Sequence, residues 1–112
     1  MSDYEHPLTV SEVRHEFGTF FDRVRLLYNL AFFKEEKGYR AEAVKKYSDE
    51  LFEANRISDY IHSIIGEAIE KFTLLSPVKL KEMNPDKLRM LSEWINISIF
   101  DINGEINELM SK

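Results

Sequence analysis

The chain has 112 residues, with 20 acidic and 15 basic side chains, a net charge of −5 and no cysteine. The absence of cysteine excludes disulfides, thiolate metal sites and thiol nucleophiles. Negative charge argues against a dedicated nucleic-acid binder, because phosphate contacts need a basic surface. With 44% hydrophobic residues, we expect residues 1–112 to form a single helical-bundle domain around one core.

The residue pattern also bears on location and origin. The first seven residues are acidic and lack an apolar stretch, so no signal peptide is expected. No apolar run approaches the ~20 residues that a membrane-spanning helix needs. We therefore expect a cytoplasmic protein, in its own cell or in a host cell. Isoleucine and lysine outnumber alanine, which is associated with AT-rich coding, as in many phages and low-GC bacteria.

The first predicted helix covers residues 9–37. Thr9 and Glu12 have the spacing of a capping box, in which each side chain bonds the other residue's backbone N–H. Glycine is the expected C-terminal cap at Gly38. Between these two caps, apolar residues recur every three or four positions, as one face of a helix requires: Val10, Val13, Phe17, Phe20, Val24, Leu27 and Ala31.

The second predicted helix covers residues 39–75, because the same apolar period continues from Val44 to Leu75. Pro77 ends it, since proline disfavours helix for the residue before it. Residues 77–83 are expected to form a connector with one short helical turn.

Part of this region resembles a known repeat. The stretch Leu27 to Asn55 resembles one tetratricopeptide-repeat hairpin, through Leu30-Ala31, Gly38, Ala43 and Tyr47. The resemblance implies an antiparallel helix pair with a tight turn at Gly38. The unit is not repeated, so it does not indicate an array, in which stacked neighbours bury the core.

The third predicted helix covers residues 85–111, after an N-cap at Asn84 and proline at the first helical position. An alternative is a hairpin, since the residues from Trp94 to Phe100 alternate like a strand and Asn103-Gly104 could form its turn. Helix is favoured because nothing upstream supplies partner strands. The expected fold is therefore all-α: an antiparallel up-down-up three-helix bundle with a short connector helix before the last helix.

Two patterns suggest catalytic or metal-binding residues. Arg56 and His62 resemble the motif of HEPN-type ribonucleases, which implies a histidine acting on a 2′-hydroxyl and an arginine stabilising the phosphate. Their place on the predicted helix, away from the core, keeps this reading as an alternative. Two carboxylate-x-x-histidine pairs, ending at His15 and His62, have the spacing of di-iron bundles. They point outward on their helices, so we expect neither a metal nor another cofactor.

A surplus of apolar surface carries the main functional expectation. Two helices show a second apolar stripe that one core does not need, and such surfaces usually mark interfaces. The predicted partner-binding residues are Leu26, Leu30, Phe33, Met90, Trp94 and Ile97. We therefore expect a non-enzymatic protein–protein interaction module, an inhibitor or adaptor that binds and modulates a larger complex, with a foreign protein or a second copy as partner. A nucleic-acid-associated accessory protein is a further alternative.

Overall fold

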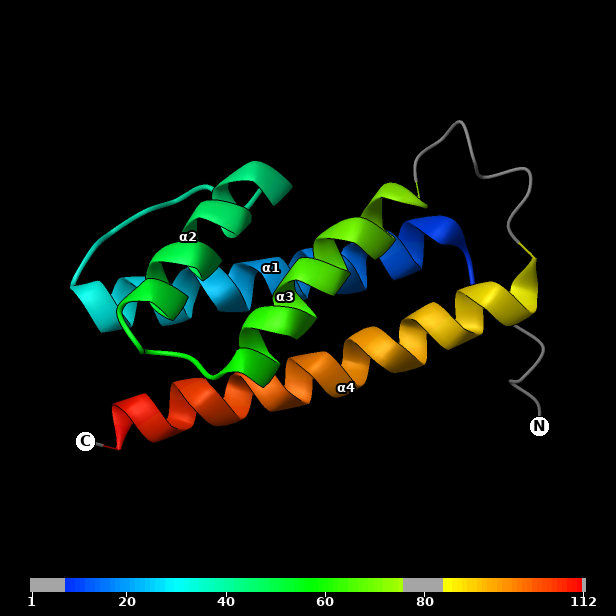
Figure 1. The fold of residues 1–112 in the computed structure, drawn as a ribbon. Helices are drawn as coiled ribbons and strands as arrows, with labels where there is room; N and C mark the ends of the chain where they lie inside the picture. The colour runs from blue at the N-terminus through cyan, green and yellow to red at the C-terminus, as the bar shows by residue number, and fades with distance from the viewer. Residues whose placement is uncertain (1–7, 76–83, 112) are drawn as a thin grey trace.

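The computed structural model describes residues 8–75 and 84–111, and its ordered elements are four α-helices (Figure 1). They are α1 (Val10–Phe32), α2 (Ala41–Glu53), α3 (Asp59–Thr73) and α4 (Pro85–Met110). The two described stretches contain no strand. The all-α prediction is confirmed, whereas the prediction of three helices is wrong. The connector helix expected at 77–83 lies outside the described residues.

α1 begins as predicted and ends earlier than predicted. The Thr9 hydroxyl accepts the Glu12 N–H at 3.1 Å, and the Glu12 carboxylate accepts the Thr9 N–H at 2.9 Å. The helix ends at Phe32 rather than at residue 37. Phe33 takes a left-handed conformation with φ 55°, so the chain turns away before the predicted glycine cap.

Residues 34–40 form an extended segment that runs back along α1. The Asn29 side-chain amide donates to the Glu36 carbonyl and accepts the Glu36 N–H, both at 3.0 Å. Arg25 donates to the same carbonyl at 3.0 Å, and the Tyr47 hydroxyl donates to the Gly38 carbonyl at 2.7 Å. α2 consequently begins over the middle of α1 (Figure 1). The predicted tight turn at Gly38 is therefore wrong.

The predicted helix 39–75 is interrupted between α2 and α3. Asn55 is left-handed with φ 59°, and the Arg56 N–H bonds the Leu51 carbonyl at 2.8 Å. This is the Schellman arrangement that ends many helices. The Ser58 hydroxyl then accepts the Ile61 N–H at 3.2 Å and starts α3. Inside the break Ile57 is buried, so the core continues from α2 into α3.

α4 matches the prediction closely. The Asn84 side chain accepts the Lys87 N–H at 2.8 Å, Pro85 occupies the first turn, and the helix continues to Met110. The hairpin alternative for residues 94–104 is therefore wrong. In Figure 1, α4 runs beside α1 in the same direction, and α3 runs in the opposite direction to both. α1 and α4 form the most extensive contact between helices.

The core follows from these contacts. Phe17 on α1 is fully buried, and its ring lies against Phe72 of α3 and Trp94 of α4. The rings of Tyr28 and Tyr47 stack between α1 and α2, with 4.4 Å between their centroids. Because the aromatic rings of α1 contact three other helices, α1 is the central element of the core.

Candidate functional site: the exposed face of α4

One side of α4 is buried and the other carries large apolar residues into solvent. The buried side is lined by Leu91, Ile95, Ile102 and Ile106. On the opposite side Met90 is 67% exposed, Ile97 62% and Phe100 78%. At 100° per residue these three side chains fall within a sector of about 80°. We call this sector the α4 face; Glu93 and Gly104, both exposed, also lie within it.

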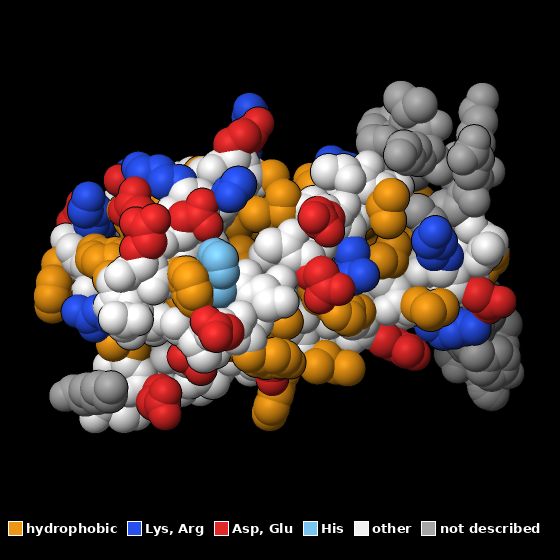
Figure 2. Space-filling view, in the orientation of Figure 1, with side chains coloured by type: hydrophobic (Ala, Val, Ile, Leu, Met, Phe, Trp, Pro, Cys, Tyr) orange, Lys and Arg blue, Asp and Glu red, His pale blue; other side chains and the backbone are white. Residues whose placement is uncertain are grey.

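Figure 2 shows hydrophobic side chains gathered along the middle of α4, at the lower edge of the molecule. Such residues are individually common on surfaces, but a contiguous group of large ones usually marks an interface. The face lies on a regular helix that starts from a side-chain cap and packs against α1. The apolar side chains are therefore held in fixed positions by ordinary helical geometry.

A polar contact from α3 borders this face. The Tyr60 hydroxyl donates to the Asp101 carboxylate at 2.7 Å, and both residues keep contact with solvent. The hydrogen bond to Asp101 first, and the negative charge of the same carboxylate second, raise the pKa of Tyr60. The start of α3 and the middle of α4 are thereby joined at the edge of the α4 face.

The structure separates the six predicted contact residues into two groups. Phe33, Met90 and Ile97 are exposed. Leu26, Leu30 and Trp94 are partly buried against the core instead. The Trp94 ring stacks on Phe17 with 6.4 Å between centroids, and the Lys71 ammonium lies 5.1 Å above it. These three side chains support the packing of the bundle and are only partly exposed.

Phe100 belongs to the α4 face and was missed by sequence reasoning. It lies three residues after Ile97, and the same spacing separates Met90 from Glu93. The heptad pattern of 90, 93, 97, 100 and 104 was the available signal. It was obscured because Phe100 ends the apolar alternation that suggested a strand.

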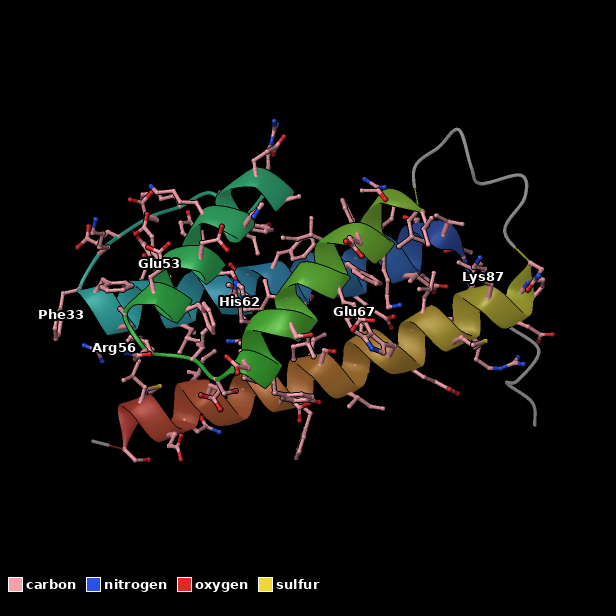
Figure 3. All side chains as sticks on the ribbon, viewed as in Figure 1. Phe33, Glu53, Arg56, His62, Glu67 and Lys87 are labelled. Atoms are coloured by element: carbon pink, nitrogen blue, oxygen red, sulfur yellow. The ribbon has the colours of Figure 1, made fainter. Side chains whose placement is uncertain are left out.

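Phe33 is the most exposed large apolar residue, at 95%. Figure 3 shows it at the C-terminal end of α1, pointing away from the helices. It stands apart from the α4 face, so the two predicted stripes do not form a single surface.

Arg56 and His62, the residues of the ribonuclease-like motif, line different cavities. His62 lies 3.1 Å from the Asp49 carboxylate, and its ring stacks on Phe52 at 4.1 Å. Arg56 lines a separate cavity of about 250 Å³ with Glu105 and Glu108 of α4. Figure 3 shows the two side chains on different elements, with His62 between α2 and α3. Within one chain, the two side chains therefore line separate cavities.

The His62 cavity, also about 250 Å³, contains a small charged cluster. Asp49 accepts from His62 and from the Lys45 ammonium, both at 3.1 Å, and these hydrogen bonds lower its pKa. The contact joins α2 to α3, so we interpret it as a structural link between the two helices.

Burial acts in the opposite direction on Glu105. Desolvation first and the neighbouring Glu108 second raise the pKa of the Glu105 carboxyl. Glu105 and Glu108 line the same cavity as Arg56, so the C-terminal half of α4 places two acidic side chains near this arginine.

Within residues 8–75 and 84–111, no group of three or more histidine, aspartate or glutamate side chains could hold a metal ion. In the same part of the chain, no helix has the length and apolar content that crossing a membrane requires. Comparisons with family models, with curated proteins and with solved structures each found no match.

Proposed function

We propose that this protein is a protein–protein interaction module that binds through the α4 face. The observation that carries the proposal is the exposure of three large apolar side chains, Met90, Ile97 and Phe100, on one side of a helix whose other side forms the core. Exposed apolar area costs solubility without stabilising the fold, whereas burial against a partner recovers about 25 cal/mol per Å².

The face also has the composition of a binding site. Methionine and phenylalanine are enriched at interfaces, and methionine adapts to irregular partner surfaces. An amphipathic helix that presents apolar residues at positions i, i+7 and i+10 matches the helix-in-groove mode of recognition. An inhibitor or adaptor acts by occupying such a groove on a larger complex.

The test compares capture of proteins by the full-length chain and by two surface variants. Phe100→Asp places a charge in the α4 face and is expected to abolish capture of a partner from a lysate of the native host. Met110→Asp is the matched control, because Met110 lies on the same helix, is 65% exposed and lies off the α4 face. Both variants are expected to keep the helical circular dichroism of the original chain, since each changes an exposed residue.

Two results would contradict the proposal. One is capture that Phe100→Asp leaves unchanged, which would place the binding surface elsewhere. The other is unfolding by Phe100→Asp, which would mean that the residue supports the fold despite its exposure.

A further inference from the structure

We propose that the α4 face binds a second copy of this chain, with the two α4 helices antiparallel and Ile97 of each copy packed against Phe100 of the other. This inference rests on the proposed function and names the partner.

The exposed positions of α4 form a repeat that supports two-fold pairing. Residues 86, 90, 93, 97, 100, 104, 107 and 111 are all exposed, and their spacing alternates between four and three. This is the a/d spacing of a coiled coil, and its apolar members are Met90, Ile97 and Phe100. The spacing reads the same from both ends, with its centre between Ile97 and Phe100. A two-fold dimer requires a surface that is complementary to itself in this way.

The charge of Glu93 favours the antiparallel orientation of the two helices. In a parallel pair, identical seam residues meet, and Glu93 would face Glu93 of the second copy. In the antiparallel pair centred between Ile97 and Phe100, Glu93 lies opposite Gly104 instead. A like-charge contact at the centre of an interface is strongly unfavourable, and the antiparallel arrangement removes it.

The residues that flank the seam complement one another in this register. Antiparallel coiled coils place e positions of one helix beside e positions of the other. Lys87 of one copy then lies beside Glu108 of the other, and the two-fold axis repeats the pair. Both side chains are exposed, and Figure 3 shows Lys87 at the N-terminal end of α4. The same rule places the Trp94 indole, which is partly buried, beside Asp101 of the second copy.

Neighbouring registers are less complementary. A shift by one heptad in one direction brings Asp101 of the two copies together. A shift in the other direction places Ile97 opposite Glu93. That second shift pairs Met90 with Phe100, but it buries Glu93 against Ile97 at both ends of the pair. Only the register centred between Ile97 and Phe100 pairs these two residues and joins Lys87 to Glu108.

Gly104 has no role in packing within one chain. A Cβ built at this position meets no atom within 4 Å, and the backbone there is helical. Glycine inside a helix is less stable than alanine, and the same open space surrounds the helical glycines Gly18 and Gly66. Opposite Glu93 of a second copy, the missing side chain leaves room for the glutamate stem beside the backbone.

The first experiment measures solution mass by sedimentation equilibrium across protein concentrations. The unaltered chain is expected to dimerise, and Ile97→Asp to weaken the dimer at least ten-fold. Tyr39→Asp, which changes an exposed residue outside α4, is expected to leave the dimer unchanged. A chain that stays monomeric at all concentrations overturns the inference, as does a dimer that Ile97→Asp does not weaken. If the chain is monomeric while Phe100→Asp still abolishes partner capture, the homodimer is wrong and the proposed function stands.

The second experiment tests orientation by cysteine crosslinking, for which this cysteine-free chain provides a clean background. E93C and G104C proteins, mixed and oxidised, are expected to form a crosslinked heterodimer, while either protein alone does not crosslink. Crosslinking of E93C with itself would indicate the parallel arrangement and overturn the proposed register.

The third experiment exchanges the flanking charges. Lys87→Glu and Glu108→Lys are each expected to weaken the dimer several-fold, and the double variant to recover the original affinity. Single variants without effect, or a double variant as weak as the single ones, would contradict the pairing of Lys87 with Glu108.

Discussion

At the scale of single residues, two aromatic side chains stand in unusual surroundings. Phe33 combines a left-handed backbone with 95% exposure. The left-handed region disfavours residues with a Cβ, and an exposed ring returns no burial energy. Tyr28 is the opposite case, since its ring is fully buried while its hydroxyl donates to the Glu50 carboxylate at 2.7 Å.

Phe33→Gly is expected to stabilise the protein by about 1 kcal/mol, because glycine occupies the left-handed region without steric cost. Urea unfolding measures the change. Phe33→Ala is the control: it removes the ring, keeps the Cβ, and is expected to give no comparable gain. A loss of stability in Phe33→Gly would show that the aromatic ring makes contacts that support the fold.

Ionisation of the Tyr28 hydroxyl is expected to destabilise the folded protein in alkali. Its hydrogen bond to Glu50, with burial, raises its pKa from the ordinary value of 10 to about 12. The folded state therefore holds this proton more tightly than the unfolded state. The resulting stability is complete below pH 10 and is lost as the pH rises toward 12.

Urea unfolding of the original chain and of Tyr28→Phe, below pH 10 and near pH 12, tests this expectation. The free energy of unfolding should decrease less between the two pH values in the variant than in the original chain. The decrease should not vanish, because burial also raises the pKa of Tyr47, which the variant retains. Equal decreases in both proteins would contradict the assignment to Tyr28.

At the scale of elements, the connections between helices departed most from prediction. The extended segment 34–40 has no periodic signal of its own. It is held by side chains from two helices: Arg25 and Asn29 of α1 and Tyr47 of α2. Sequence periodicity cannot reveal such contacts, because each joins a side chain to a backbone group on another element.

Asn29→Ala is expected to destabilise the protein by about 1–3 kcal/mol, since it removes both hydrogen bonds to Glu36. The Glu36 amide should also exchange with solvent faster in hydrogen-exchange measurements. Asn29→Asp keeps an acceptor for this amide and loses only the donor, so its effect should be smaller. Unchanged exchange at Glu36 in the alanine variant would show that the segment is held by other contacts.

The break between α2 and α3 has a different cause. Asn55 and Ser58 are ordinary turn and cap residues, and the sequence contained this signal. It was outweighed because the apolar period continues on both sides, so that one long helix and two short ones bury nearly the same residues. Cap chemistry, rather than periodicity, distinguishes these two structures.

At the scale of the whole molecule, Phe17 joins three helices. It lies on α1 and contacts Phe72 of α3 and Trp94 of α4. Phe17→Ala is expected to cost about 3–5 kcal/mol, as for other buried aromatic residues. Unfolding followed by Trp94 fluorescence and by circular dichroism should shift together, because both report the same core.

Met110→Ala is the matched control for this variant, since it truncates an exposed side chain and should change stability by no more than about 0.5 kcal/mol. Separate transitions by the two probes would show that the packing around Trp94 is not coupled to the helices as a whole.

The candidate site was partly predictable from the sequence. The second apolar stripe on α4 identified Met90 and Ile97, because the angle of a residue around a regular helix predicts which side it faces. The same reasoning placed Leu26, Leu30 and Trp94 on the surface, although they lie partly buried against the core. Helical angles do not show how closely α1 and α4 pack, and this contact decides how far each flank is covered.

Periodicity and caps alone determined that the chain is helical, where α1 begins, and where α4 lies, because these features depend on residues within a few positions of one another. Only the tertiary structure decided where α1 ends, how residues 34–40 return along it, and which apolar flanks remain exposed. Those features depend on hydrogen bonds and packing between elements distant in the chain, such as Asn29 with Glu36 and Phe17 with Trp94.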